Sequence, residues 1–164
     1  MNRRNLLIGL SLLVVAGAGF GVTGGKSLIS NFVGNGDARA EVFTGNTDEI
    51  AIRGYDPVGY FTQSKPVKGK PEYSTKWKGV NWHFSSAENL EKFVADPEKF
   101  APKYGGYCAY AVANGSTAKT VPEAWTIHDG KLYLNYSAGI KARFDKDKQG
   151  YIEKADRNWP EIAK

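Results

Sequence analysis

The sequence predicts an α+β fold, a small single domain of antiparallel hairpins packed with short helices. Two glycine-containing dipeptides, Lys78-Gly79 and Asp129-Gly130, each join two runs rich in β-prone residues. Between these hairpins, Leu90, Phe93 and Val94 recur at the spacing of one helix face. The chain has 164 residues, of which 41% are apolar, which is enough for one packed core.

The first part of the predicted domain is built around a proline turn. Residues 51–57 start as a short extended piece and then turn, because Pro57 fixes its own φ and biases Asp56 away from helix. Residues 58–61 form a second short strand or a helical turn. Residues 65–71 alternate lysine with proline and glycine, which is typical of an exposed loop.

The first hairpin and a capped helix follow this loop. Residues 72–77 and 80–84 are the two predicted strands. Ser85 is the predicted N-cap of the helix, and Glu88 three residues later completes a capping box. The helix is expected to end near Asp96.

A second hairpin and a helical tail complete the domain. The remaining predicted elements are a helical turn (97–100), a compact apolar segment (108–112), a hairpin (124–128 and 131–135) and one or two helices (137–158) that end at Trp159-Pro160. No internal repeat or low-complexity run is apparent after residue 40, so we expect one domain from about Val42 to Ile162.

The N-terminus, residues 1–40, is predicted to be an export signal. The pair Arg3 and Arg4 precedes an apolar run, residues 6–20, which is shorter than the roughly 20 apolar residues that span a membrane. The arginine pair resembles a twin-arginine signal, with an ordinary Sec signal as the alternative. Ala38 and Ala40 form an A-x-A cleavage site.

We therefore expect cleavage after Ala40, with an uncleaved N-terminal membrane anchor as the alternative. Either way, residues 41–164 form the predicted domain and lie in the periplasm or outside the cell, with membrane contact only through the N-terminus. Beyond residue 40 the chain carries 18 Lys and Arg against 16 Asp and Glu, a net charge of +2. This near-neutral balance predicts no nucleic-acid partner, and the sequence identifies no protein partner.

Few side chains are available for chemistry. The sequence has no CxxC, HExxH, GxSxG or phosphate-loop motif, so it does not predict an enzyme. The imidazoles and thiol are His83, His128 and Cys108, and a single cysteine excludes an intramolecular disulfide. Strand alternation places His83 on the face opposite Trp82 and Phe84.

The other candidates have structural as well as functional interpretations. His128 lies near a hairpin tip, where a solvated turn histidine is expected. Asp56 precedes a proline, where its side chain can close an Asx turn. Cys108 is a buried small hydrophobe, a metal ligand or a nucleophile with His83 as its base.

Several short landmarks together resemble the YHS domain family, most strongly its exported bacterial branch. The landmarks are Gly54-Tyr55-Asp56-Pro57-Val58, Trp77-Lys78-Gly79, Trp82-His83-Phe84-Ser85-Ser86, Phe93-Val94-Ala95-Asp96-Pro97 and Tyr104-Gly105-Gly106-Tyr107-Cys108-Ala109. The resemblance covers most of residues 42–160. It implies a small YHS-like domain with a metal-related role, copper being the metal suggested for the family.

The resemblance also implies thiols that this chain lacks. The family's DPVCG is similar to residues 56–60 and its FCSxxC to residues 84–89, and the positions of the expected thiols hold Gly59, Ser85 and Asn89. Thiolates are the ligands that select Cu(I) or Zn²⁺.

The resemblance implies an exported metal-binding or metal-handling accessory protein, with copper or another transition metal as its cofactor. Its ligands would be Cys108, His83, His128 and Asp56. The alternative is a non-metal ligand-binding or protein-interaction module of the periplasm, in which Cys108 is structural and Tyr55, Tyr104 and Tyr107 bind the ligand.

Overall fold

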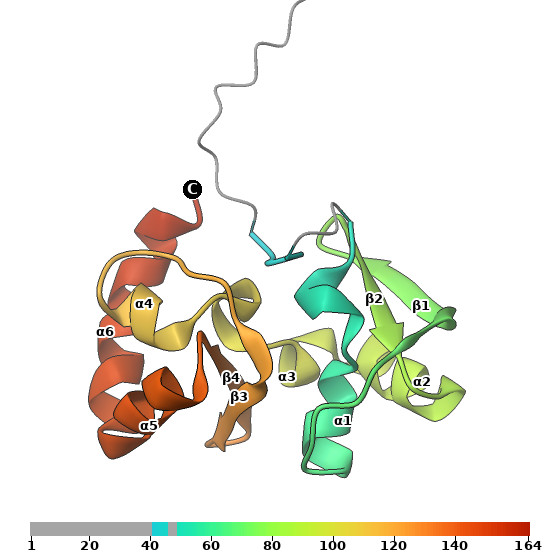
Figure 1. Cartoon of the computed structure of the whole chain (residues 1–164). Coiled ribbons are helices and arrows are strands. Elements are labelled where there is room, and N and C mark those ends of the chain that lie inside the picture. Colours follow the sequence, from blue (N-terminus) through green and yellow to red (C-terminus); the bar gives the residue numbers. More distant parts are fainter. Residues whose placement is uncertain (1–40, 46–48) are drawn as a thin grey trace, which may run out of the picture. The chain divides into compact units, whose positions relative to one another are not determined.

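The computed structural model describes residues 41–45 and 49–164, which belong to one compact unit. The predicted export signal, with Arg3, Arg4, Ala38 and Ala40, lies outside the described residues. The described part combines short helices with two antiparallel hairpins, which confirms the predicted α+β class (Figure 1). None of its helices is both long and apolar enough to cross a membrane.

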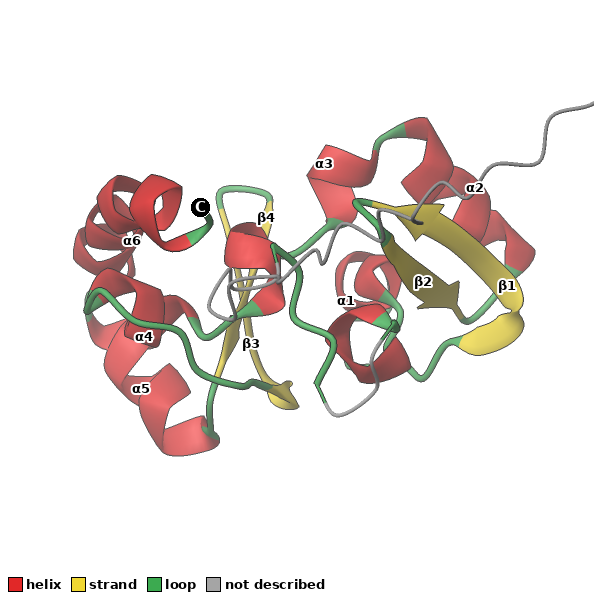
Figure 2. Ribbon diagram, turned by 90° about the horizontal axis from the view of Figure 1, so that it is seen from above, coloured by secondary structure: helices red, strands yellow, loops and turns green. Residues whose placement is uncertain are grey.

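The same order of elements occurs twice along the chain. The first half contains η1 (Ala51–Gly54), α1 (Pro57–Thr62), β1 (Lys70–Trp77), β2 (Val80–Phe84), α2 (Ala87–Ala95) and α3 (Pro97–Phe100). The second half contains η2 (Lys103–Gly106), α4 (Ala109–Ala113), β3 (Val121–His128), β4 (Lys131–Asn135), α5 (Ala138–Lys146) and α6 (Lys148–Ile162). Each half is a 3₁₀ turn, a short helix, a hairpin and two further helices, and each hairpin is a separate two-stranded sheet (Figure 2).

Both predicted hairpins are present, and their turns explain why. Trp77 pairs with Val80 and His128 pairs with Lys131, so a two-residue turn joins each pair of strands. The turn residues Lys78-Gly79 and Asp129-Gly130 all have positive φ, between 47° and 79°. Positive φ at both central positions is the type I′ geometry that matches the twist of the flanking strands.

Two hydrophobic clusters stabilise the unit. The first is centred on Trp82, Phe84 and Phe93 of the first half, and the second on Tyr104 and Phe144 of the second half. Leu132 and Leu134 of β4 belong to the first cluster, so the second hairpin contributes to the core of the first half.

The structure differs from the sequence prediction at residues 51–54 and at the N-cap of α2. Residues 51–54 form a tight 3₁₀-type turn rather than an extended piece, and within it Ile52 and Arg53 take left-handed φ of 40° and 59°. Residues 58–61, for which a short strand or a helical turn was predicted, lie in the helix α1. Ser86, not Ser85, caps α2, since its Oγ accepts a hydrogen bond from the Asn89 N–H at 3.2 Å.

Two further helix details were wrong. Val94 was expected on the buried face of its helix and is 58% exposed. Trp159-Pro160 was expected to end the last helix, but α6 continues to Ile162.

Candidate functional site

The Asp56 carboxylate is completely buried and accepts five hydrogen bonds. Its Oδ1 accepts from the backbone N–H of Val58 at 2.9 Å and of Gly59 at 3.2 Å, which caps α1. Its Oδ2 accepts from the Ser85 backbone N–H at 2.8 Å, the Ser85 hydroxyl at 2.6 Å and the Asn89 side-chain amide at 2.7 Å. Asp56 therefore ties α1 to the end of β2 and to α2, and its oxygens are engaged by protein donors.

The three residues at the positions of the expected thiols all contact the Asp56 carboxylate. Gly59, Ser85 and Asn89 all donate to Asp56, although they come from three different elements. A hydroxyl and an amide replace thiolates, which are the ligands that soft metals select. The residues present at this place do not fit a Cu(I) or Zn²⁺ site, and they form a hydrogen-bonded anchor instead.

Cys108 is a packed thiol, 1% exposed, at the start of α4. Its Sγ lies 3.6 Å from Oδ1 of the buried Asn135, and its backbone N–H donates to the Ala118 carbonyl at 3.0 Å. Burial raises the pKa of the Cys108 thiol, and hydrogen bonding by the backbone of Ala111, Tyr136 and Tyr110 acts in the opposite direction. The balance favours the protonated thiol, which is the poor nucleophile and poor metal ligand of the two forms.

The two histidines lie on different hairpins. His83 is in β2, on the opposite face from the buried Trp82 and Phe84 as alternation predicts. His128 is the last residue of β3, and its Nε2 lies 3.5 Å from an oxygen of Asp129. Within residues 41–45 and 49–164, no three His, Cys, Asp or Glu side chains form a group that could hold a metal ion. The structure does not bring His83, His128, Cys108 and Asp56 together in one centre.

His83 is expected to make the protein less stable in mild acid. Burial, and then the nearby Lys68 ammonium, lower the pKa of His83 below the usual 6.5. As the pH falls below about 6.5 the unfolded chain takes up a proton that the folded chain resists, so stability falls. The urea midpoint of the wild-type protein should decrease between pH 7.5 and pH 5. This decrease should be smaller in His83→Gln and unchanged in the matched variant His128→Gln. An unchanged pH profile in His83→Gln would contradict this prediction.

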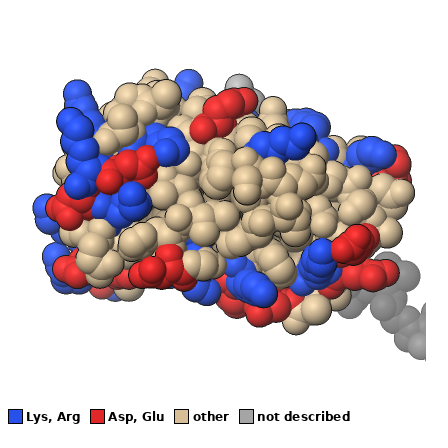
Figure 3. All heavy atoms as spheres, turned by 90° about the horizontal axis from the view of Figure 1, so that it is seen from below, with Lys and Arg blue, Asp and Glu red and all other residues tan. Residues whose placement is uncertain are grey.

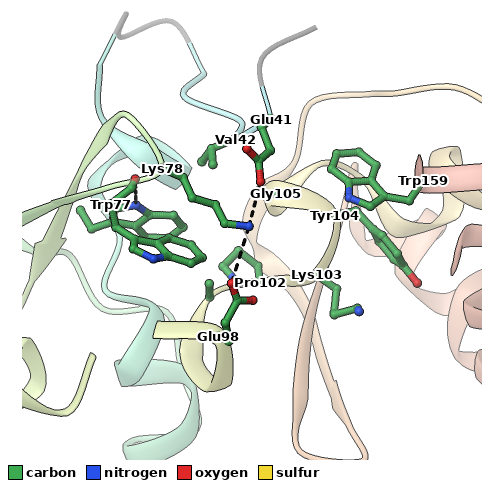
Figure 4. Close-up of a pocket in the computed structure, with 12 residues that line it drawn as sticks. Glu41, Val42, Trp77, Lys78, Glu98, Pro102, Lys103, Tyr104, Gly105 and Trp159 are labelled. Carbon is green, nitrogen blue, oxygen red and sulfur yellow. Dashed lines mark hydrogen bonds and ion pairs between the residues drawn. The ribbon is translucent and has the colours of Figure 1, made fainter. Parts of the chain in front are cut away.

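A pocket of about 120 Å³ lies between the first hairpin turn and the segment that connects the two halves (Figure 4). We call it the Lys78 pocket, and its lining residues are Glu41, Val42, Trp77, Lys78, Trp82, Glu98, Ala101, Pro102, Lys103, Tyr104, Gly105 and Trp159. Residues from four separate parts of the chain thus meet at one cavity.

The Lys78 ammonium is the central charge of this pocket. Its Nζ lies 2.8 Å from a Glu41 oxygen, 3.7 Å from a Glu98 oxygen and 4.8 Å from the centre of the Trp77 ring. Figure 4 shows the Lys78 side chain reaching between the two carboxylates. The hydrogen bond with Glu41 raises the pKa of Lys78 above its usual 10.5, so the group is cationic at neutral pH.

Aromatic rings line opposite sides of the pocket. Trp77 is the last residue of β1, where it packs edge-on against Trp82 at 5.6 Å. Trp159 comes from α6 and packs against Tyr104 at 5.9 Å, and Figure 4 places it across the pocket from Trp77. Indole faces offer flat apolar contact area beside the Lys78 charge.

The three predicted ligand-binding tyrosines are not gathered at one site. Tyr104 lines the Lys78 pocket and donates its hydroxyl hydrogen bond to Asp156 at 2.9 Å. Tyr107 packs against the rings of Phe43 and Trp159. Tyr55 lies under the Lys68 ammonium, 4.6 Å from the ring centre.

Sequence reasoning missed most of the pocket. Trp77 was placed only at the end of a predicted strand, and Lys78 only in a turn. Glu41, Glu98 and Trp159 carried no motif, because their proximity depends on contacts between segments far apart in the chain.

On the face seen in Figure 3, acidic and basic side chains are interspersed.

The comparisons with known proteins identify one part of the chain. Residues 58–104 match the YHS domain family, which confirms the resemblance over that segment. The matched segment contains Trp77, Lys78 and Glu98 of the pocket, whereas Glu41 and Trp159 lie outside it. No curated protein and no solved structure matches the chain.

Proposed function

We propose, taking the YHS domain of residues 58–104 as the premise, that this protein is a binding module that takes a small flat carboxylate into the Lys78 pocket. The observation that carries the proposal is the Lys78 ammonium, held by Glu41 in the wall of a cavity that is flanked by two indoles. Aromatic rings combined with a few convergent polar groups, here Lys78 with Glu41 and Glu98, are typical of the lining of small-molecule sites.

The contacts of Lys78 favour an anionic ligand over a cationic one. A carboxylate can replace Glu98, which is the looser partner at 3.7 Å and whose side chain is 75% exposed. Exposed ion pairs of this kind are worth only about 0–1 kcal/mol, so the exchange costs little. A cation would have to displace the Lys78 ammonium and break its contacts with Glu41, Glu98 and Trp77 together.

The size of the cavity restricts the ligand to about one ring. A closed cavity of about 150 Å³ holds a benzene molecule, and the Lys78 pocket has about 120 Å³ and is partly open to solvent. We therefore propose a ligand no larger than a single planar ring with one carboxylate, partly exposed to solvent, with the ring against Trp77 or Trp159 and the carboxylate at Lys78. A free metal ion is not the ligand we propose, because the expected metal-ligating side chains are not assembled among the described residues.

The lysine is expected to set the preference among ring-sized ligands. In isothermal calorimetry, benzoate should bind more tightly than benzyl alcohol, and benzyl alcohol more tightly than benzamidine. Lys78→Gln should weaken benzoate binding about tenfold, which corresponds to the loss of one charge-assisted hydrogen bond of about 1.4 kcal/mol. Its matched control is Lys92→Gln, since Lys92 pairs with Glu88 on α2 and does not line the pocket. A preference for benzamidine, or an equal loss in Lys92→Gln, would rule out the proposal.

We also propose that the chain is exported and that cleavage after Ala40 releases it. The mature protein would then begin at Glu41, the residue that pairs with Lys78 in the wall of the pocket. Intact-mass measurement of protein recovered from the periplasm should give a chain that starts at Glu41. A chain of full length, or one recovered only from the cytoplasm, would contradict this proposal.

A further inference from the structure

We infer that residues 103–162 are a second, diverged copy of the fold built by residues 51–100, and that Cys108 holds in this copy the position that Asp56 holds in the first. The family match ends at residue 104 and so includes only the first two residues of the second copy. The inference is independent of the proposed ligand, because it rests on element lengths and backbone hydrogen bonds that do not require the pocket to be occupied.

Corresponding elements of the two halves have nearly equal lengths. The 3₁₀ turns have four residues each, the hairpin strands eight and five residues each, and α2 and α5 nine residues each. The helix before the hairpin has six residues in α1 and five in α4. Only the last helices differ greatly, with four residues in α3 and 15 in α6.

Irregular features recur at a constant spacing of 51 residues. The strand register shifts between Lys70 and Ser74 in the first hairpin and between positions 121 and 125 in the second. Ser86 and Ser137 cap the next helices with similar backbone angles, φ of −153° and −159°. Bulges and caps are position-specific features that the α+β class does not require, so their coincidence indicates a common origin.

Hydrogen bonds before the hairpins show the same correspondence. The Asp56 N–H donates to the carbonyl of Val67, and the Cys108 N–H donates to that of Ala118, at 2.8 and 3.0 Å. The N–H of residue 55 donates to the carbonyl of residue 52, and the N–H of residue 107 to that of residue 104. The spacing is 52 residues before the short helix and 51 after it, as the one-residue difference between α1 and α4 requires.

Asp56 and Cys108 are surrounded by corresponding backbone groups. The Asp56 carboxylate accepts from the N–H groups of residues 58, 59 and 85. Hydrogen bonding by the backbone of residues 110, 111 and 136, which are their counterparts at spacings of 52, 52 and 51, acts to lower the pKa of the Cys108 thiol. The second copy thus places a thiol where the first has the carboxylate, and one of the corresponding N–H groups, that of Tyr110, donates to Asn135 Oδ1 at 3.2 Å.

One buried polar side chain near the thiol distinguishes the second copy from the first. Asn135 is completely buried, and its Oδ1 accepts from the Tyr110 N–H at 3.2 Å and faces the Cys108 sulfur. The Asn135 Nδ2 has no hydrogen-bond partner among the described residues. At the spacing of 51 residues Asn135 corresponds to Phe84, so its amide has no counterpart among the donors to Asp56 and is a feature of the second copy alone.

The Cys108→Asp variant tests this equivalence, because an aspartate at an ordinary buried thiol position would be strongly disfavoured when charged. If position 108 corresponds to position 56, the introduced carboxylate is stabilised by N–H donors and its pKa lies below that of the unfolded chain. The urea midpoint of Cys108→Asp, measured relative to the wild-type protein, should then rise as the pH increases from 3 to 7.

The matched control is Val112→Asp, which places a side chain of similar size at a completely buried position in the same helix. Its urea midpoint should fall relative to wild type over the same pH range, or the variant should not fold. The equivalence of Asp56 and Cys108 is overturned if Cys108→Asp does not fold, or if its midpoint falls with increasing pH as that of the control does.

Discussion

Replacing Asp56 with alanine is expected to lower the free energy of unfolding by about 3–5 kcal/mol, because each buried donor left unpaired costs about 1–3 kcal/mol and part of that cost is relieved by water. Five donors from Val58, Gly59, Ser85 and Asn89 lose their acceptor together. Urea denaturation followed by tryptophan fluorescence measures the effect.

Asp96→Ala is the control for the loss of a helix cap alone. The Asp96 Oδ1 accepts from the Lys99 N–H at the start of α3, at an exposed position. Loss of such a cap costs about 1 kcal/mol. If the two variants lose the same stability, the buried network does not anchor the first half, and this interpretation of Asp56 is wrong.

Replacing Gly105 with alanine is expected to displace the segment that contains Glu41 and to lower the free energy of unfolding by about 2–4 kcal/mol, from overpacking and a left-handed backbone together. Gly105 has φ of +60°, and a Cβ there would meet the Glu41 carbonyl oxygen, a backbone atom that no side-chain rotation can move away. The hydrogen bond from the Phe43 N–H to the Gly105 carbonyl, 2.9 Å, would be lost with it.

Gly105→Ala should also weaken benzoate binding, because Glu41 no longer positions the Lys78 ammonium. The matched control is Gly115→Ala, since Gly115 has φ of +79° but open space around its Cβ position. That variant should lose only about 1 kcal/mol, the cost of the backbone conformation, and should bind benzoate normally. Equal losses of stability in the two variants would show that the contact between Gly105 and Glu41 contributes nothing.

The hairpins could be predicted because their signals are local. Lys78-Gly79 and Asp129-Gly130 fix two-residue turns with positive φ whatever the rest of the chain does. The signals for helix caps are nearly as local, but at α2 two adjacent serines, Ser85 and Ser86, could each be the N-cap. Ser86 takes the cap, and Ser85 is drawn to Asp56 instead.

The candidate site could be predicted only in fragments, because its contacts join distant segments. Asp56 was identified as a turn residue, but its bonds to Ser85 and Asn89 span 29 and 33 residues. The Lys78 pocket needs Glu41 and Trp159, from the two ends of the described chain. The repeated order of elements was hidden because it is retained in backbone features while the side chains differ, as Asp56 and Cys108 do.

The most direct test of the proposed site is a spectrum of the four tryptophan indole N–H groups, recorded in ¹⁵N-labelled protein during titration with benzoate. Trp77, Trp82 and Trp159 line the Lys78 pocket, whereas Trp125 packs against Tyr60. Binding in the pocket predicts that the signals of Trp77 and Trp159 move with saturation while that of Trp125 stays in place. Four unmoved signals, or a shift of Trp125 as large as the others, would contradict the assignment of this pocket as the binding site.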